Sequence, residues 1–255
     1  MTFLRSLLFN ILFFTWSTIM VILYIPALAA NRRVVMHGQR NWARGVNFLM
    51  RWVAGITWRI EGHENIADGA AIYAIKHQSA WDTMILHVLF PDPAVVMKQE
   101  LLNIPVYGWY CKHTRHIPID RSAGSSALKK MLEAARNARD AGRQIVIFPE
   151  GTRTTPGEGG KHLPGVAALY KHLELPVIPV ALNSGLFWGR EAFFKRPGTI
   201  TVRFLPAIEP GGDRREFMTL LQDRVEGESA RLMAEKRARY PFLPAPRQEP
   251  AAPVE

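Results

Sequence analysis

The chain has 255 residues, with 32 lysines and arginines against 22 aspartates and glutamates and a formal net charge of +10. This length suits one large domain with an appended segment, and the positive charge favours an anionic partner such as a membrane surface, nucleic acid or a phosphorylated substrate. The single cysteine, Cys111, excludes an intramolecular disulfide and fits a reducing compartment.

Residues 6–30 form the first long apolar stretch and carry no charged side chain. About 20 apolar residues are enough to cross a bilayer as a helix, so this stretch predicts an uncleaved membrane anchor, which either spans the bilayer or lies in one leaflet. A cleaved signal peptide is the alternative, because residues 27–29 resemble a cleavage site, but the stretch is long for such a peptide. Four arginines between residues 32 and 44 predict, by the positive-inside rule, that the rest of the chain faces the cytoplasm at the inner membrane.

Residues 41–60 mix tryptophans and arginines with other apolar residues. This composition predicts an amphipathic helix in the membrane interface, with packing on the globular domain as the alternative. Residues 1–60 are thus expected to form an N-terminal membrane-associating helical region, and residues 61–241 a single α/β domain. Residues 242–255 are rich in proline and alanine and are expected to be a disordered tail.

Between these ends, short apolar runs alternate with helical patterns. The expected strands are residues 71–76, 94–98, 116–120, 145–148 and 177–182, with residues 199–205 as an edge strand. The expected helices are residues 79–89, 125–141, 165–173 and 213–239, the last with a candidate break at Gly227. Such alternation predicts an α/β fold with a mixed, largely parallel sheet flanked by helices.

A polar turn follows the first expected strand. His77 ends that strand, and Asp82 falls in the first turn of the next helix, which Ser79 would cap. A carboxylate placed there can accept a hydrogen bond from one imidazole nitrogen, which fixes the tautomer and leaves the other nitrogen as a base. The alternative is a surface histidine beside an unrelated capping aspartate.

A second polar turn, Phe148-Pro-Glu-Gly-Thr-Arg153, follows the buried strand 145–148. Its Gly151 permits a close approach between the backbone and a ligand. Arg153 offers planar donors that suit a phosphate, and Glu150 either holds that guanidinium group or meets a substrate hydroxyl. The alternative is that Glu150 and Arg153 pair only with each other.

Both turns resemble sequence blocks of the glycerolipid acyltransferases. His77-Gln-Ser-Ala-Trp-Asp82 resembles their H-x-x-x-x-D block, and Phe148-Pro-Glu-Gly-Thr-Arg153 matches their F-P-E-G-T-R block. Residues 117–121 are similar to the intervening block, usually G-x-I-F-I-D-R, although Arg115 and Pro118 depart from it, and residues 177–181 are similar to the last block. The resemblance covers residues 62–205.

The resemblance implies transfer of a fatty acyl group to the free hydroxyl of 1-acyl-glycerol-3-phosphate, which gives phosphatidic acid. The acyl donor would be acyl-CoA or acyl carrier protein, with membrane lipids as further partners and without nucleic acid, metal or cofactor. His77, oriented by Asp82, would be the general base, and backbone amides at the start of the next helix are candidate oxyanion donors. The residues implied to bind the acceptor are Lys98, Arg121, Glu150, Gly151, Thr152 and Arg153.

Other functions stay open. The acceptor could be another lysolipid, or the chain could be a non-enzymatic basic protein that binds anionic lipid headgroups. Lipid hydrolysis is a further alternative, but no Gly-x-Ser-x-Gly nucleophile motif accompanies it. Cys111 could carry a covalent acyl intermediate, although a lone cysteine among aromatic residues more often serves packing. His113 and His116 have the spacing of metal ligands, but nothing else in the sequence completes a metal site.

Overall fold

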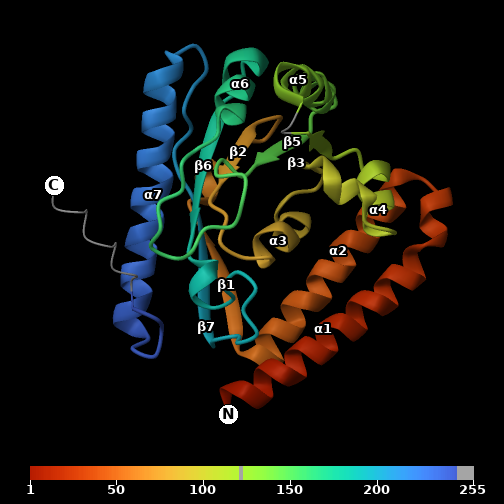
Figure 1. Ribbon diagram of the computed structural model, residues 1–255, viewed down its shortest axis with the longest axis vertical. Helices are drawn as coiled ribbons and strands as arrows, with labels where there is room; N and C mark the ends of the chain where they lie inside the picture. Colours follow the sequence, from red (N-terminus) through yellow and green to blue (C-terminus); the bar gives the residue numbers. More distant parts are fainter. Residues whose placement is uncertain (121–122, 246–255) are drawn as a thin grey trace.

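The computed structural model describes residues 1–120 and 123–245. Its centre is a seven-stranded sheet with the strand order β1-β7-β6-β2-β5-β3-β4 (Figure 1). Neighbouring strands are parallel except for β6 and β7, which are antiparallel. The predicted mixed, largely parallel sheet flanked by helices is therefore confirmed.

The strands are β1 (Ile56–Glu61), β2 (Ile72–Ile75), β3 (Pro93–Lys98), β4 (Ile117–Ile119), β5 (Gln144–Ile147), β6 (Val177–Leu182) and β7 (Gly198–Phe204). The α-helices are α1 (Thr2–Tyr24), α2 (Arg32–Leu49), α3 (Trp81–Leu89), α4 (Tyr107–His113), α5 (Gly124–Asp140), α6 (Pro164–Leu173) and α7 (Arg214–Arg239). Short 3₁₀ turns cover Pro26–Ala29, His63–Asn65, Gln99–Asn103 and Ser184–Leu186, and Met50–Ala54 form a π-helical turn.

Two hydrophobic cores lie on opposite faces of the sheet, and β2 contributes to both. Successive strand residues point to opposite faces, so Tyr73 and Ile75 pack with α1, α2 and α3, whereas Ile72 and Ala74 pack with α5, α6 and α7. Every residue of β2 and of β6 is buried. Central strands covered on both faces read as continuous apolar runs, which is why the sequence predicted them well.

The structure corrects the prediction of one helix over residues 41–60. The helical backbone instead begins at Arg32, continues through Met50–Ala54 and ends at Gly55, whose φ of +73° suits a residue without a Cβ. Residues 56–61 form β1, which pairs in parallel with β7. The expected boundary between residues 60 and 61 therefore falls within a strand of the sheet.

Three further expectations need correction. The strand expected at the edge over residues 199–205 is β7, which lies between β1 and β6; its alternating pattern arises because Ile200 and Val202 enter the core while Arg203 forms ion pairs with acidic side chains. Helix α7 passes Gly227 without a break. In the expected tail, Leu243 packs into the core, and residues 246–255 lie outside the described residues.

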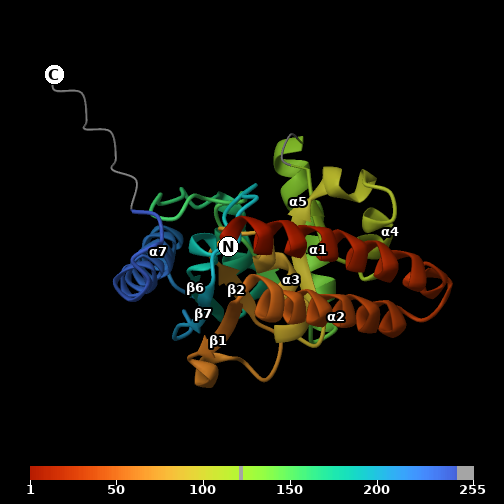
Figure 2. The same cartoon turned by 90° about the horizontal axis from the view of Figure 1, so that it is seen from below.

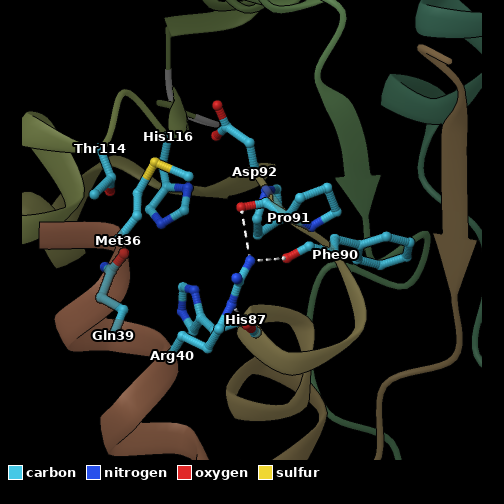
Figure 3. A pocket seen from close by; sticks show the side chains of 10 residues that line it. Met36, Gln39, Arg40, His87, Phe90, Pro91, Asp92, Thr114 and His116 are labelled. Carbon is cyan, nitrogen blue, oxygen red and sulfur yellow. Dashed lines mark hydrogen bonds between the residues drawn. The ribbon is translucent and has the colours of Figure 1, made fainter. Parts of the chain in front are cut away.

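Arginine side chains attach α2 to the loop between α3 and β3. Arg32 Nη1 donates to Asp92 Oδ2 at 2.8 Å, and Arg143 Nε donates to Asp92 Oδ1 at 2.9 Å. Arg40 donates to the carbonyl groups of His87 and Pro91 at 3.2 and 3.1 Å (Figure 3). A chamber of about 10 Å³ beside them has room for about one water molecule. Arg40, one of the four arginines counted for the positive-inside rule, therefore points into the protein.

Asp92→Asn is expected to lower the free energy of unfolding at neutral pH by about 1–3 kcal/mol, because two arginines lose their charged partner. Burial opposes ionisation of Asp92, but the bonds from Arg32 and the nearby charge of Arg143 hold its pKa below the ordinary 3.8. This stabilisation is therefore present above about pH 4 and disappears as the pH falls through the folded-state pKa. Thermal melting in detergent across pH 2–7 measures it.

The matched control is Asp140→Asn, whose carboxylate is 64% exposed and pairs with the adjacent Arg139. Its melting temperature should stay at the wild-type value. Equal melting temperatures for Asp92→Asn and the wild type at pH 7 would contradict the assigned role of Asp92.

Candidate active site

His77 and Asp82 meet where β2 ends and α3 begins. His77 Nδ1 lies 3.0 Å from Asp82 Oδ2. Asp82 is fully buried, whereas the His77 side chain keeps 13% of its surface exposed. The imidazole stacks on the Phe148 ring, with 4.0 Å between ring centroids and 23° between the planes. The predicted contact between the two side chains is therefore confirmed, and the ring is held between the aspartate and the second polar turn.

Four donors fix the Asp82 carboxylate. Besides His77, the backbone amides of Gln78 and Ser79 each donate to Oδ2 at 2.7 Å. Ser184 Oγ donates to Oδ1 at 2.5 Å. Because the first two amides of this turn already bond to Asp82, they are not available as oxyanion donors, which corrects the expectation for that part of the turn.

The expectation that Ser79 caps α3 needs correction, because the residue before the helix is Ala80, which makes no side-chain capping bond, and the bonds of Ser79 only resemble those of a capping box. Ser79 Oγ accepts from the Trp81 amide at 3.1 Å, while the Asp82 carboxylate accepts from the Ser79 amide. The helix begins at Trp81, two residues after the serine. The Trp81 indole donates to Asn47 Oδ1 at 3.0 Å, so α2 also holds this turn.

The second polar turn is bonded directly to the first. Gly151 has a φ of +66°, which a residue with a Cβ rarely adopts. Three residues later, Thr154 donates to the His77 carbonyl oxygen twice, from its amide at 2.8 Å and from its hydroxyl at 3.1 Å. Since β2 and β5 are neighbours in the sheet, these bonds keep both turns at one edge.

Both turns face a groove of about 910 Å³. The predicted site residues that line it are His77, Lys98, Gly151, Thr152 and Arg153. In the part of the chain that the structure describes, no carboxylate forms an ion pair with the Lys98 ammonium or the Arg153 guanidinium group. Both cations can therefore meet an anionic ligand. Arg121 lies outside the described residues.

The Glu150 side chain does not line the groove. Its side chain is 1% exposed and lies with Oε1 2.8 Å from Lys76 Nζ. It therefore pairs with Lys76 rather than with Arg153, and its carboxylate is directed away from the groove lining. The expectation that Glu150 holds Arg153 is wrong, because Glu150 lies in the turn after β5 and its carboxylate is paired with the buried Lys76 ammonium.

Two half-buried histidines, His87 and His116, line part of the groove. Burial, with the nearby charge of Arg40, lowers the pKa of His87 to about 4, and burial lowers the pKa of His116 to about 3. Both rings are therefore neutral at physiological pH. His116 Nδ1 accepts a hydrogen bond from the Val95 amide at 3.2 Å, so this nitrogen is already bonded to the backbone of β3.

Cys111 is a poor candidate for a covalent intermediate. Its side chain lies in α4 and is 2% exposed. Burial raises the pKa of the thiol to about 11. Because the thiolate is the nucleophile, a thiol that stays protonated at neutral pH does not react readily with an acyl thioester.

Several residues around the site escaped prediction from the sequence. Ser184 bonds to Asp82 across 102 positions. Gln78 is buried, and its Oε1 accepts from the Gly185 amide at 3.2 Å. Of these residues, Lys76 could have been recognised from the sequence, since it is a lysine at the end of an otherwise apolar strand. The partners of the others depend on the tertiary fold.

Comparisons with known proteins identify the family of this chain. An acyltransferase family model matches residues 57–183. The chain is 36% identical over 238 residues to 1-acyl-sn-glycerol-3-phosphate acyltransferase of Pseudomonas aeruginosa, covering 91% of each protein. It is 32% identical over 195 residues to the protein of that name from Limnanthes douglasii, covering 76% of this chain and 67% of that one.

A solved structure has the same fold. The crystal structure of the 1-acyl-sn-glycerophosphate acyltransferase PlsC from Thermotoga maritima matches with a TM-score of 0.73 and 21% identity, over 94% of this chain and 99% of that chain. With the family model and the Pseudomonas relative, it leads to one conclusion: the chain belongs to the acyltransferase family.

Proposed function

We propose that this chain transfers a fatty acyl group from a thioester donor to the free hydroxyl of 1-acyl-glycerol-3-phosphate, which gives phosphatidic acid. The observation that carries the proposal is that His77, held by Asp82, lines the same groove as Lys98 and Arg153. The groove thus combines a base with phosphate-binding cations. The names of the relatives from Pseudomonas and Limnanthes support this acceptor.

The reaction follows from the position of the imidazole. With Nδ1 bonded to Asp82, Nε2 is the nitrogen that accepts the proton of the acceptor hydroxyl. The hydroxyl oxygen then attacks the thioester carbonyl carbon, so a C–O bond forms. The C–S bond breaks, and the departing thiolate takes the proton from the imidazolium. The chain needs no covalent intermediate for these steps.

The two cations orient the acceptor. Lys98 ends β3 and Arg153 belongs to the turn after β5, and these strands are neighbours in the sheet. A phosphate bound by both would hold the glycerol hydroxyl near His77, and such positioning lowers the entropic part of the barrier. Gly151 and Thr152 line the same wall of the groove. For Arg121 a phosphate contact stays a prediction.

The apolar lining of the groove supports binding of the acyl chains. It includes side chains of β3, β4 and α5, namely Val95, Met97, Ile119, Ala127, Leu128 and Met131. We assign the donor to the acyl thioesters of CoA or acyl carrier protein, which share the phosphopantetheine thiol. The donor enters as a co-substrate, and the proposed steps use no metal or cofactor.

We infer that α1 lies in one leaflet of the membrane. Of the described helices, Thr2–Ala29 is long and apolar enough to span a bilayer. However, hydrogen bonds join it to the domain near both ends. Arg5 Nε donates to the Val53 carbonyl at 2.9 Å, and the Tyr110 hydroxyl donates to the Val21 carbonyl at 2.9 Å. Figure 2 shows α1 lying alongside α2, so a spanning orientation would break these contacts.

The outer face of this helix pair suits a lipid surface. The exposed large apolar side chains of α1 include Phe3, Leu4, Leu8, Ile11, Phe14, Ile19, Ile22 and Leu23. On α2 and the following turn, Phe48 and Trp52 are exposed next to Arg44 and Arg51. Aromatic side chains beside arginines fit the headgroup region of an anionic membrane. We therefore propose attachment to the cytoplasmic face of the inner membrane.

His77→Ala should reduce kcat by about 10²–10⁴-fold, because the acceptor hydroxyl loses its general base. Mass spectrometry of phosphatidic acid formed from lysophosphatidic acid and acyl-CoA measures the rate. His37→Ala, on the exposed face of α2, is the control and should keep wild-type turnover. Substantial activity in a folded His77→Ala protein would rule out the base assignment.

Arg153→Ala should raise the KM for lysophosphatidic acid by about 10-fold or more, because a charge-assisted contact to the phosphate is lost. The same variant should use monoacylglycerol, which lacks the phosphate, about as well as the wild type does. Arg136→Ala, which removes an exposed arginine of α5, is the control. Unchanged kinetics for both acceptors would refute phosphate binding by Arg153.

Replacing Phe48 and Trp52 together with glutamate should weaken binding to vesicles of phosphatidylglycerol and phosphatidylcholine by about 10-fold or more, because two apolar side chains no longer enter the lipid. Turnover of substrate dissolved in detergent should persist. Leu220→Glu changes an α7 leucine that is 40% exposed and is the matched control. Vesicle flotation measures binding, and equal flotation of all three proteins would contradict the proposed membrane face.

A further inference from the structure

Behind the two active-site turns lies a buried charge cluster, which consists of Lys76, Glu150, His162 and Glu226. Lys76 directly precedes His77 and Glu150 directly precedes Gly151. Their side chains are each 1% exposed, and that of His162 is fully buried. Glu226 comes from the middle of α7, which packs along β6 (Figure 1). The cluster thus joins the two turns to α7, whose described contribution to the groove lining is Arg214.

Lys76 is the cation of this cluster. Its Nζ lies 2.8 Å from Glu150 Oε1 and 2.7 Å from both carboxylate oxygens of Glu226. The ligand atoms of Glu150, His162 and Glu226 lie within 4.8 Å of one another, a spacing that would suit a metal ion. The ammonium group, however, already lies between the two carboxylates. It therefore supplies the positive charge that a metal would otherwise supply.

Opposing effects act on the pKa of each carboxyl group in the cluster. Burial raises the pKa of Glu150 above its ordinary value, and the charge of Lys76 opposes that effect. Burial acts in the same direction on Glu226, but the nearby His162 and the hydrogen bonds from Lys76 hold its pKa below the ordinary value. Within the described residues, the oxygens of Glu150 accept no hydrogen bond of good geometry. The ion pair with Lys76 is thus the main attachment of Glu150.

The cluster lies on the opposite side of the turns from the groove. Lys76 and His77 are consecutive residues at the end of an extended strand, so their side chains point to opposite faces. On one side, Thr154 bonds to the His77 carbonyl oxygen. On the other, Lys76 pairs with Glu150. The Lys76–Glu150 ion pair is therefore a second link, besides the Thr154 bonds, between the strand end that carries His77 and the turn that carries Arg153.

We propose that Glu226 is a positioning residue for acyl transfer. From α7 it fixes the Lys76 ammonium, and through Lys76 and Glu150 it sets the distance between His77 and the phosphate-binding turn. This inference rests on the proposed function, because that distance matters only when one substrate contacts both turns.

The test compares Glu226→Gln with Glu228→Gln in the full-length protein. Both changes remove one negative charge from α7. Glu228, two residues further along, pairs with Arg203 and Arg231 instead of Lys76. We expect Glu226→Gln to lower kcat/KM for lysophosphatidic acid by about 10-fold or more, because a small misplacement of reacting groups is costly. Most of the loss should appear in kcat, and Glu228→Gln should match the wild type.

A double-mutant cycle separates positioning from a general loss of structure. Lys76→Gln and Glu226→Gln should each lower kcat/KM, and the double variant should be no slower than the slower single variant, because both act through one ion pair. Additive losses, or a wild-type kcat in Glu226→Gln, overturn the proposal. If Glu226→Gln does not fold, Glu226→Asp takes its place: it keeps the charge, moves it by one methylene group and should lower kcat.

The activity of the wild type separates a failure of the proposed function from a failure of the positioning role alone. If the wild type forms no phosphatidic acid at all, the proposed function fails. If the wild type is active and the Glu226 variants match it, only the positioning role fails. Stoichiometric metal in the purified wild type, measured by mass spectrometry and lost in Glu226→Gln, would also overturn the proposal, because a metal ion would then occupy the place assigned to Lys76.

Discussion

The hydrogen bond from His77 to Asp82 is the contact on which the site depends. A histidine can act as a base only when one nitrogen is free and the ring has a fixed orientation. Asp82 provides both conditions, because its own position is set by two backbone amides and the Ser184 hydroxyl. Those donors come from the turn between β2 and α3 and from the segment after β6. The pair of His77 and Asp82 is thus positioned by separate segments at one edge of the sheet rather than by one loop.

The sheet also explains why the proposed base, His77, and the two cations share a groove. Strands β2, β5 and β3 are parallel neighbours, so their carboxyl ends lie at one edge. Ligand sites of α/β folds form at such an edge. His77, Arg153 and Lys98 each follow or end one of these strands. Parallel pairing therefore converts three separate sequence positions into one binding surface, while the side chain of Lys76, one position before His77, pairs with Glu150 away from the groove.

How much of this could be predicted from the sequence differs from one residue to the next. The contact between His77 and Asp82 could be predicted, because five positions and one strand-to-helix corner define it. The strands β2 and β6 were equally clear, since a strand buried on both faces is apolar throughout. Strand β1 was missed because its mixture of tryptophan, arginine and apolar residues continues the composition of α2. Glu226 could not be paired with Lys76, because 150 positions separate them and only the tertiary fold brings them together.

The hydrogen bond between the Trp81 indole and Asn47 has a consequence for assays of this protein. Asn47 is the neighbour of Phe48, which faces outward on α2, and Trp81 is the neighbour of Asp82. A single helical turn thus contacts the surroundings on one side and the aspartate-bearing helix on the other. Under the proposed membrane attachment, the detergent or lipid around Phe48 lies one hydrogen bond away from the helix that carries Asp82, so it is a variable to hold fixed when activities are compared.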